Sequence, residues 1–110
     1  MGVTGLETAF PVLYTDLVLP GVLTLALVVE RMTAGAALLD LPTPRIAVGE
    51  PANLALLDLD ASWEVGARGY ASKSANCCFE GMSVRGRVLM TVAAGQVAFR
   101  QRSFALGVAA

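Results

Sequence analysis

The sequence predicts an α+β fold in which helices come first and strands follow. Apolar residues recur at helical spacing in the first part of the chain, whereas the second part shows period-two alternation and a hairpin pattern. Pro42 and Pro44 lie between the two parts, and proline is a poor continuation of a helix. We therefore divide the chain into a mostly helical segment, residues 1–42, and a β-rich segment, residues 43–110.

Helices are expected at three places in the first segment. Within residues 6–17, apolar side chains recur every three or four positions, which is typical of an amphipathic helix. Pro11 interrupts this pattern, so either the helix kinks there or it begins near Thr8, which puts Pro11 in the first turn, where its missing N–H costs least. A second helix is expected over residues 23–32 and a short third helix over residues 33–39.

The β-rich segment begins with residues 46–65, which combine a turn, a long apolar run and the chain's single tryptophan. Gly49 and Pro51 favour the turn, because glycine tolerates positive φ and proline presets a turn angle. The apolar run predicts a strand covered on both faces. Turn-forming residues at 60–62 predict a reversal, with a second short strand from Trp63.

A long loop and a hairpin are expected next. Residues 66–82 are rich in glycine and serine and predict the loop. Alternating apolar residues on either side of Ala94 and Gly95 predict a β-hairpin over residues 86–100. Residues 101–110 have no strong pattern and are expected to fray.

The composition calls for an apolar partner surface. Hydrophobic residues make up 55% of the chain and charged residues 15%, with a net charge of −1. The uncharged apolar stretch over residues 17–29 is too short to span a bilayer, which takes about 20 residues. No basic residue precedes Arg31, so we expect no secretory signal, no membrane partner and a cytoplasmic location. Scattered basic residues also make nucleic acid an unexpected partner.

Residues 5–15, GLETAFPVLYT, closely resemble the stretch that follows the last barrel strand in dihydroorotases. Residues 46–65, with Gly49, Asp58 and Trp63, resemble the C-terminal β-sandwich segment of cyclic amidohydrolases, the group that contains this family. Residues 72–81 are similar to a loop of the same family. These pieces occur in the family's order, so the chain resembles the C-terminal portion of a dihydroorotase.

The resemblance has departures. The chain has Met1 where the family has Phe, Asn53 where it tends to have Asp, Ala-Gly-Ala at 34–36 in place of Asn-Pro-Ala, and Cys77-Cys78 in place of Thr-Pro. These differences fit a truncated or diverging copy.

The resemblance implies the last helices of a (β/α)8 barrel, a TIM barrel, followed by C-terminal strands of a small β-sandwich. It also implies the family's activity, the reversible hydrolysis of dihydroorotate to N-carbamoyl-aspartate in de novo pyrimidine biosynthesis, which uses zinc held largely by histidines. This chain has no histidine. We therefore expect no metal ligand, cofactor or catalytic residue within it, and no activity from the chain alone.

One substrate-binding residue follows from the resemblance. Gly2 aligns with the glycine of a Phe-Gly pair whose backbone approaches substrate in dihydroorotases, and Met1 takes the place of the Phe. A plain loop glycine is an equally good interpretation.

Other reactive side chains have simpler interpretations. Asp58, Asp60 and Glu64 are spaced like a carboxylate cluster, but a solvated polar turn is favoured. Cys77 and Cys78 are two soft ligands, and a structural zinc site needs about four.

Three functional hypotheses follow. The chain is a segment of an enzyme and needs the rest of the barrel, or a complementary fragment, as its partner. Alternatively, it is a non-catalytic dihydroorotase-like interaction protein, with aspartate transcarbamoylase as a candidate partner. As a third possibility it is a fragment of an allantoinase or hydantoinase, although residues 5–15 match dihydroorotase better.

Overall fold

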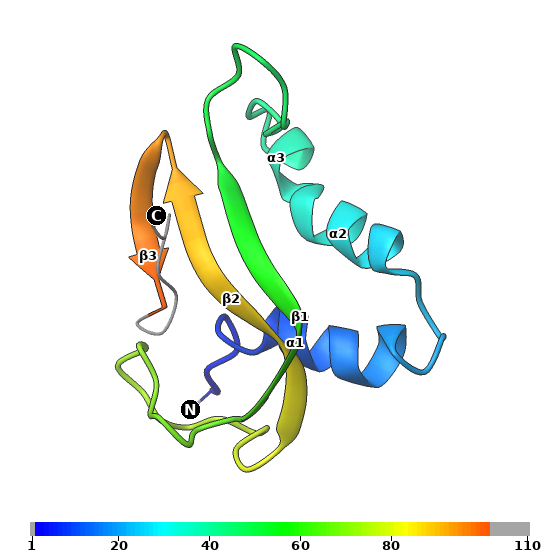
Figure 1. The fold of residues 1–110 in the computed structure, drawn as a ribbon, viewed down its shortest axis with the longest axis vertical. Helices are drawn as coiled ribbons and strands as arrows, with labels where there is room; N and C mark the ends of the chain where they lie inside the picture. The colour runs from blue at the N-terminus through cyan, green and yellow to red at the C-terminus, as the bar shows by residue number, and fades with distance from the viewer. Residues whose placement is uncertain (1, 102–110) are drawn as a thin grey trace. The chain divides into compact units, whose positions relative to one another are not determined.

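The structure is a computed structural model that describes residues 2–101. Its elements, in chain order, are α1 (Ala9–Leu13), the π-helix η1 (Tyr14–Val18), α2 (Leu25–Thr33), α3 (Gly35–Leu38), β1 (Leu54–Glu64), β2 (Ser83–Ala93) and β3 (Gln96–Arg100) (Figure 1). The predicted α+β class is confirmed, with helices before strands. The predicted fraying of residues 102–110 lies outside the described residues.

The first helix begins after Thr8, in line with the second of the two interpretations of Pro11. Thr8 is the N-cap residue, and Pro11 lies in the first turn, where it is buried. The helix does not end at Leu13 but widens into the π-helix η1, in which the Leu19 N–H donates to the Tyr14 carbonyl over 2.9 Å. Gly21 follows with φ +88°, a value that favours glycine and turns the chain.

The strands form one sheet in the order β1-β2-β3. β1 and β2 run in opposite directions (Figure 1), and β2 pairs antiparallel with β3 from Met90↔Arg100 to Ala93↔Gln96. The turn between β2 and β3 has positive φ at Ala94 (49°) and Gly95 (79°), as a two-residue primed turn requires. The hairpin expected over residues 86–100 therefore has a longer first strand, which begins at Ser83.

β1 differs from its sequence prediction. It is one continuous strand, so the reversal at 60–62 and the separate strand from Trp63 are wrong. The physical reason is that polar and apolar residues keep alternating through this region: Asp60, Ser62 and Glu64 are exposed, whereas Ala61 and Trp63 are partly buried. The same alternation shows that β1 is not covered on both faces within the described residues.

The chain forms two compact units, each built from two segments distant in sequence. Unit 1 consists of Met1–Arg31 and Leu59–Arg87, and unit 2 of Met32–Asp58 and Val88–Ala110. In the described chain, helices fall within residues 1–42 and strands within residues 43–110, yet each unit draws on both segments. The division at residue 42 therefore separates kinds of secondary structure, and as a domain boundary it stays a prediction.

The core of unit 1 is small. Three valines are buried in it, Val28, Val65 and Val84, with exposed fractions of 3%, 1% and 2%. Thr8 belongs to the same unit and is also buried, with an exposed fraction of 2%. Across residues 2–101, no helix has the length and apolar character needed to cross a bilayer.

Candidate functional site

The N-terminal segment around Gly2 is the first part of the candidate site. Gly2 is exposed with φ +108°, and a Cβ built on it would meet nothing within 4 Å. Glycine is therefore favoured here by backbone conformation and not by crowding. The side-chain Nδ2 of Asn76 donates to the Gly2 carbonyl, and the Thr4 N–H donates to the Asn76 carbonyl over 2.8 Å. Asn76 thus ties this segment to the loop after β1.

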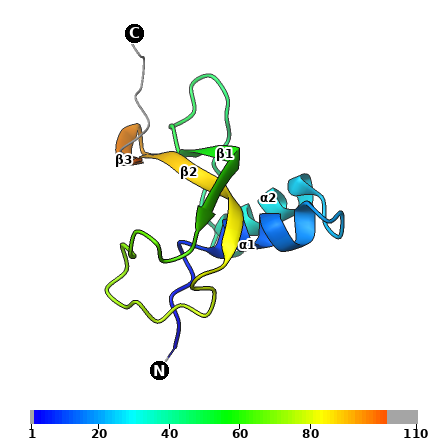
Figure 2. The same ribbon diagram turned by 60° about the horizontal axis from the view of Figure 1, so that its bottom comes forward.

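Glu7 makes a second connection to the same loop. Its Oε1 accepts from the Ala71 N–H over 3.0 Å, and its Oε2 accepts from the N–H and the hydroxyl of Ser72 over 3.0 and 2.9 Å. The Ala71 hydrogen bond is the main cause that lowers the pKa of Glu7, with Ser72 adding to it and partial desolvation opposing it. The carboxylate is therefore held in its ionised form. In Figures 1 and 2 the N-terminal segment runs beside this loop.

Hydrogen bonds between its two halves hold the loop closed. The Val65 N–H donates to the Met82 carbonyl over 3.0 Å. The Tyr70 hydroxyl donates to Glu80 Oε1 over 3.2 Å. Desolvation, with contributions from Cys77 and Glu80, raises the pKa of Tyr70 to about 12, so its hydroxyl stays a neutral donor. A Cβ on Gly66 would lie 2.8 Å from the Tyr70 hydroxyl, so only glycine leaves room for this contact.

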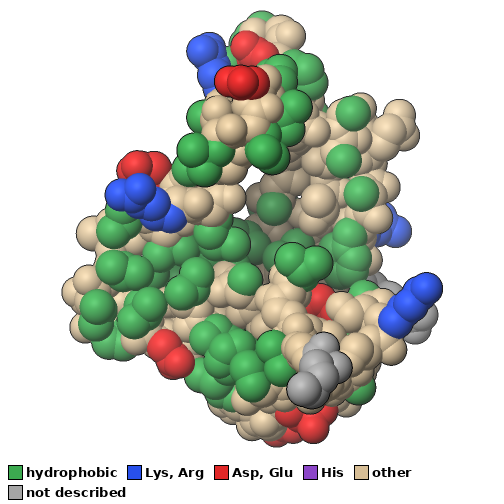
Figure 3. Space-filling model, turned by 180° about the vertical axis from the view of Figure 1, so that it is seen from behind, with side chains coloured by type: hydrophobic (Ala, Val, Ile, Leu, Met, Phe, Trp, Pro, Cys, Tyr) green, Lys and Arg blue, Asp and Glu red, His purple; other side chains and the backbone are tan. Residues whose placement is uncertain are grey.

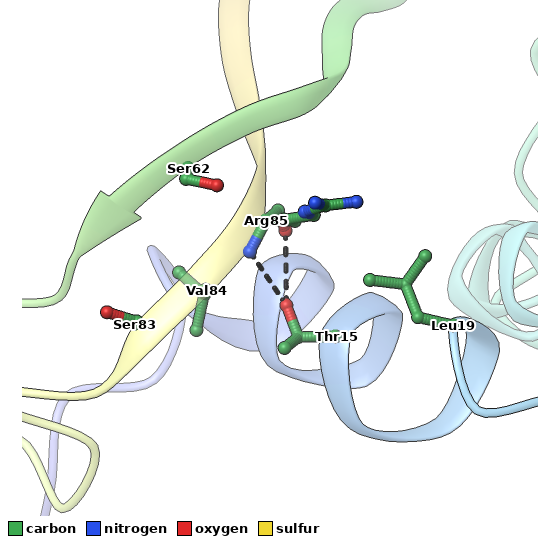
Figure 4. A pocket seen from close by; sticks show the side chains of 6 residues that line it. All are labelled: Thr15, Leu19, Ser62, Ser83, Val84 and Arg85. Carbon is green, nitrogen blue, oxygen red and sulfur yellow. Dashed lines mark hydrogen bonds between the residues drawn. The ribbon is translucent and has the colours of Figure 1, made fainter.

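A small cavity lies between η1 and the start of β2 in unit 1 (Figure 4). Its volume is about 220 Å³, below the roughly 300–1,000 Å³ typical of small-molecule pockets. The Thr15 hydroxyl is already engaged: it accepts from the Arg85 N–H over 2.8 Å and donates to the Arg85 carbonyl over 3.3 Å. The lining has no carboxylate, imidazole or thiol, so it offers no acid–base chemistry near neutral pH; it consists of Thr15, Leu19, Ser62, Ser83, Val84 and Arg85.

The aromatic residues near Gly86 make structural contacts. The Trp63 indole N–H donates to the Gly86 carbonyl over 2.9 Å, which supplies the acceptor that a partly buried indole needs. The Arg87 guanidinium lies 5.7 Å from the Trp63 ring centroid. Gly86 has φ +96°, and a Cβ there would approach Phe10 to 3.4 Å and Tyr14 to 3.6 Å.

The carboxylates of β1 do not gather into a site. Asp58, Asp60 and Glu64 occupy alternate exposed positions along the strand. Within residues 2–101 no group of three or more His, Cys, Asp or Glu side chains is placed to hold a metal ion. Within that range the side chains therefore do not fit a zinc site.

The two neighbouring cysteines of this loop differ in exposure. Cys77 is half-buried and Cys78 exposed, and both are free thiols. Sequence reasoning placed Gly2 in the site but missed Glu7 and Asn76, which hold the Gly2 segment to the loop. Glu7 is 65 residues from its partner Ser72, and Asn76 is 74 residues from its partner Gly2. Only the family motifs that contain Glu7 and Asn76 could have pointed to these two residues.

Comparison with known proteins gives a consistent result. No family model matches the chain. It is 46% identical over 100 residues to a dihydroorotase of Lactiplantibacillus plantarum, covering 89% of this chain and 23% of that protein. It is 40% identical over 100 residues to the Brevibacillus brevis dihydroorotase, covering 90% and 24%, and 36% identical over 103 residues to a Bacillus cereus dihydroorotase, covering 93% and 24%.

The chain spans only about a quarter of the length of these curated relatives, 23–24%. The matches nevertheless extend over almost all of the chain and agree with one another. By sequence, this chain is similar to dihydroorotases over about nine-tenths of its own length.

Proposed function

We propose that this chain is the C-terminal segment of a dihydroorotase and supplies the last barrel helices and the C-terminal strands of its small sandwich. The observation that supports this most is the 35–46% identity to dihydroorotases over about nine-tenths of the chain. The order of elements supports it further, because helices precede a three-stranded sheet. The expected location is the cytoplasm.

In this proposal the reaction is the reversible hydrolysis of dihydroorotate to N-carbamoyl-aspartate, and the segment contributes packing and one backbone contact. Its zinc ligands and acid–base groups belong to the remainder of the protein, because this chain has no histidine. Gly2 is the residue that we place against substrate. Its exposed backbone and the open space around its Cα are what such a close approach requires.

The exposed apolar surface supports the need for that remainder. Leu38, Ile46 and Val48 have exposed fractions of 84%, 91% and 106%. Figure 3 shows hydrophobic side chains spread widely over one face of the molecule. Large exposed apolar areas are typical of surfaces that bind more protein.

The test is reconstitution. The chain is co-expressed with the remainder of the Lactiplantibacillus plantarum dihydroorotase, and zinc-dependent hydrolysis of dihydroorotate is measured. We expect activity from the complex and none from either part alone. Replacing Gly2 by Ala should lower the activity, because alanine is strained at φ +108°, whereas replacing Gly5 by Ala should not, because its φ is ordinary and its surroundings are equally open.

Each result has a distinct meaning. A tight complex without activity would favour the non-catalytic interaction protein, and adding aspartate transcarbamoylase to that complex would test the candidate partner. Activity on allantoin or hydantoin in place of dihydroorotate would favour the third hypothesis. Failure to form any complex would overturn the proposal.

A further inference from the structure

We propose that Asn76 is a positioning residue that fixes the Gly2 backbone for substrate, and that Glu7 anchors the loop on which Asn76 lies. The inference rests on the proposed function, because it assumes that Gly2 approaches substrate. It assigns a task to the loop after β1, which has no other task in the site.

Asn76 holds the N-terminal segment from both sides of Val3. Its side-chain Nδ2 donates to the carbonyl of Gly2, and its own carbonyl accepts from the N–H of Thr4 over 2.8 Å. The Asn76 N–H in turn donates to the Ser74 hydroxyl over 3.1 Å, which orients the Asn76 backbone. Because the two bonds lie on either side of Val3, they fix the orientation of the N-terminal segment as well as its distance from the loop.

Glu7 provides a second attachment point at a distance from the first. Its carboxylate accepts three hydrogen bonds from Ala71 and Ser72, of 2.9 to 3.0 Å. Because the two attachments are separated along both the N-terminal segment and the loop, the segment cannot pivot about either one. Charge-assisted bonds to backbone N–H groups are also stronger than neutral ones.

The contacts fit positioning better than bulk stabilisation. Gly2 and Asn76 are exposed, so their bond buries little apolar surface. The Thr4 hydroxyl is buried without a hydrogen-bond partner among the described residues, which is a cost to the segment and not a gain. The bonds therefore set the position of the Gly2 backbone. Small displacements of a substrate-contacting group are costly to catalysis, so this position matters.

The chain offers a matched pair of variants. Asn76→Asp keeps the size of the side chain but removes the N–H that donates to Gly2. It also introduces a negative charge next to the Gly2 carbonyl. Asn53→Asp makes the same change of charge in unit 2, where Asn53 uses Oδ1 to accept from the Ala94 N–H over 2.9 Å, so aspartate keeps that bond.

Two measurements apply to this pair. In the full 110-residue chain, hydrogen exchange of the Thr4 amide should be faster by roughly three- to tenfold in Asn76→Asp, the factor expected from one lost neutral hydrogen bond, and unchanged in Asn53→Asp. In the reconstituted complex, KM for dihydroorotate should rise by a similar factor in Asn76→Asp only. A merely structural role would lower the active fraction, and hence kcat, and leave KM unchanged.

The outcomes separate the inference from the function on which it rests. Unchanged Thr4 exchange in Asn76→Asp, or the same KM in both variants, would overturn the inference while the wild-type complex stays active. An inactive wild-type complex would overturn the proposed function, and with it the substrate role of Asn76, whereas the exchange experiment would still report whether the attachment exists.

Discussion

Unit 1 and unit 2 differ in how well their apolar residues are covered. Unit 1 contains every buried residue of the described chain, namely Thr8, Pro11, Val28, Val65, Val84 and Gly86. In unit 2, no residue up to Gln101 is buried, although Leu38, Ile46 and Val48 are as apolar as any in unit 1. Unit 1 therefore has a core of its own, whereas the described part of unit 2 has an apolar composition without one.

Under the proposed function, unit 2 is the part of the chain that packs against the remainder of the protein. The chain spans 23–24% of the length of its curated relatives, and the proposal assigns the covering contacts to the other three quarters. If that is the reason for the exposure, truncating an apolar side chain in unit 1 will lower folding stability, whereas truncating one in unit 2 will change surface properties only.

The largest difference between the units is expected from valine truncation. Replacing the buried Val84 by Ala removes two methyl groups from the core and should lower the free energy of unfolding by about 2–3 kcal/mol. Replacing the fully exposed Val48 by Ala should change it by less than about 0.5 kcal/mol. Urea denaturation followed by circular dichroism measures both. Equal effects would remove the distinction between the units.

Glycine substitutions should have opposite signs in the two units. Gly86→Ala places a Cβ at φ +96° against Phe10 and should destabilise the chain by about 1–2 kcal/mol. Gly35→Ala, in α3 of unit 2, meets nothing within 4 Å and should stabilise by up to about 1 kcal/mol. Thermal midpoints of the two variants check this. A stabilised Gly86→Ala would show that the close approach at Phe10 is unimportant.

A pH-dependent effect is expected at Glu7 in unit 1. Because its folded-state pKa is lowered, its contribution to stability is present above the ordinary glutamate pKa and is lost as the pH falls through the lowered value. Glu7→Gln should cost on the order of 1 kcal/mol at pH 7, and the difference from wild type should vanish in acid. Urea midpoints measured from pH 7 to pH 2 test this. A constant difference over that range would contradict the role of the carboxylate.

The smallest effect on stability, but a visible one on surface properties, is expected in unit 2. The isolated chain should bind the dye ANS or self-associate, because so much apolar surface is exposed. Ile46→Gln should reduce dye fluorescence and shift stability by less than about 0.5 kcal/mol. Glu50→Gln, in the same turn region, is the control and should leave fluorescence unchanged. A compact monomer that does not bind the dye would show that unit 2 needs no partner.

Local features of the fold could be predicted from the sequence. Helical spacing and period-two alternation gave the α+β class, and the first-turn preference of proline gave a helix that begins after Thr8. The reversal predicted at 60–62 was wrong because the turn propensity of Asp60 and Ser62 was weighed above the alternation that continues through them. Propensity is a weak guide when a long strand has a pairing partner.

The candidate site was less predictable for a different reason. The bonds from Asn76 to Gly2 and from Ser72 to Glu7 join residues 74 and 65 positions apart, and periodicity says nothing about contacts at that range. The resemblance to a family identified both segments as matching pieces, and the structure was needed to show that they contact each other.

The bond between Thr15 and Arg85 has a consequence for solubility. Among the described residues, β2 extends to Ser83, whereas its pairing with β3 runs from Met90 to Ala93, so the first part of β2 would be an open sheet edge on that side. The Thr15 hydroxyl fills both the N–H and the C=O position of Arg85, as an added strand would. The backbone groups of Arg85 are therefore not available to another strand, and occupied edge groups of this kind disfavour edge-to-edge association.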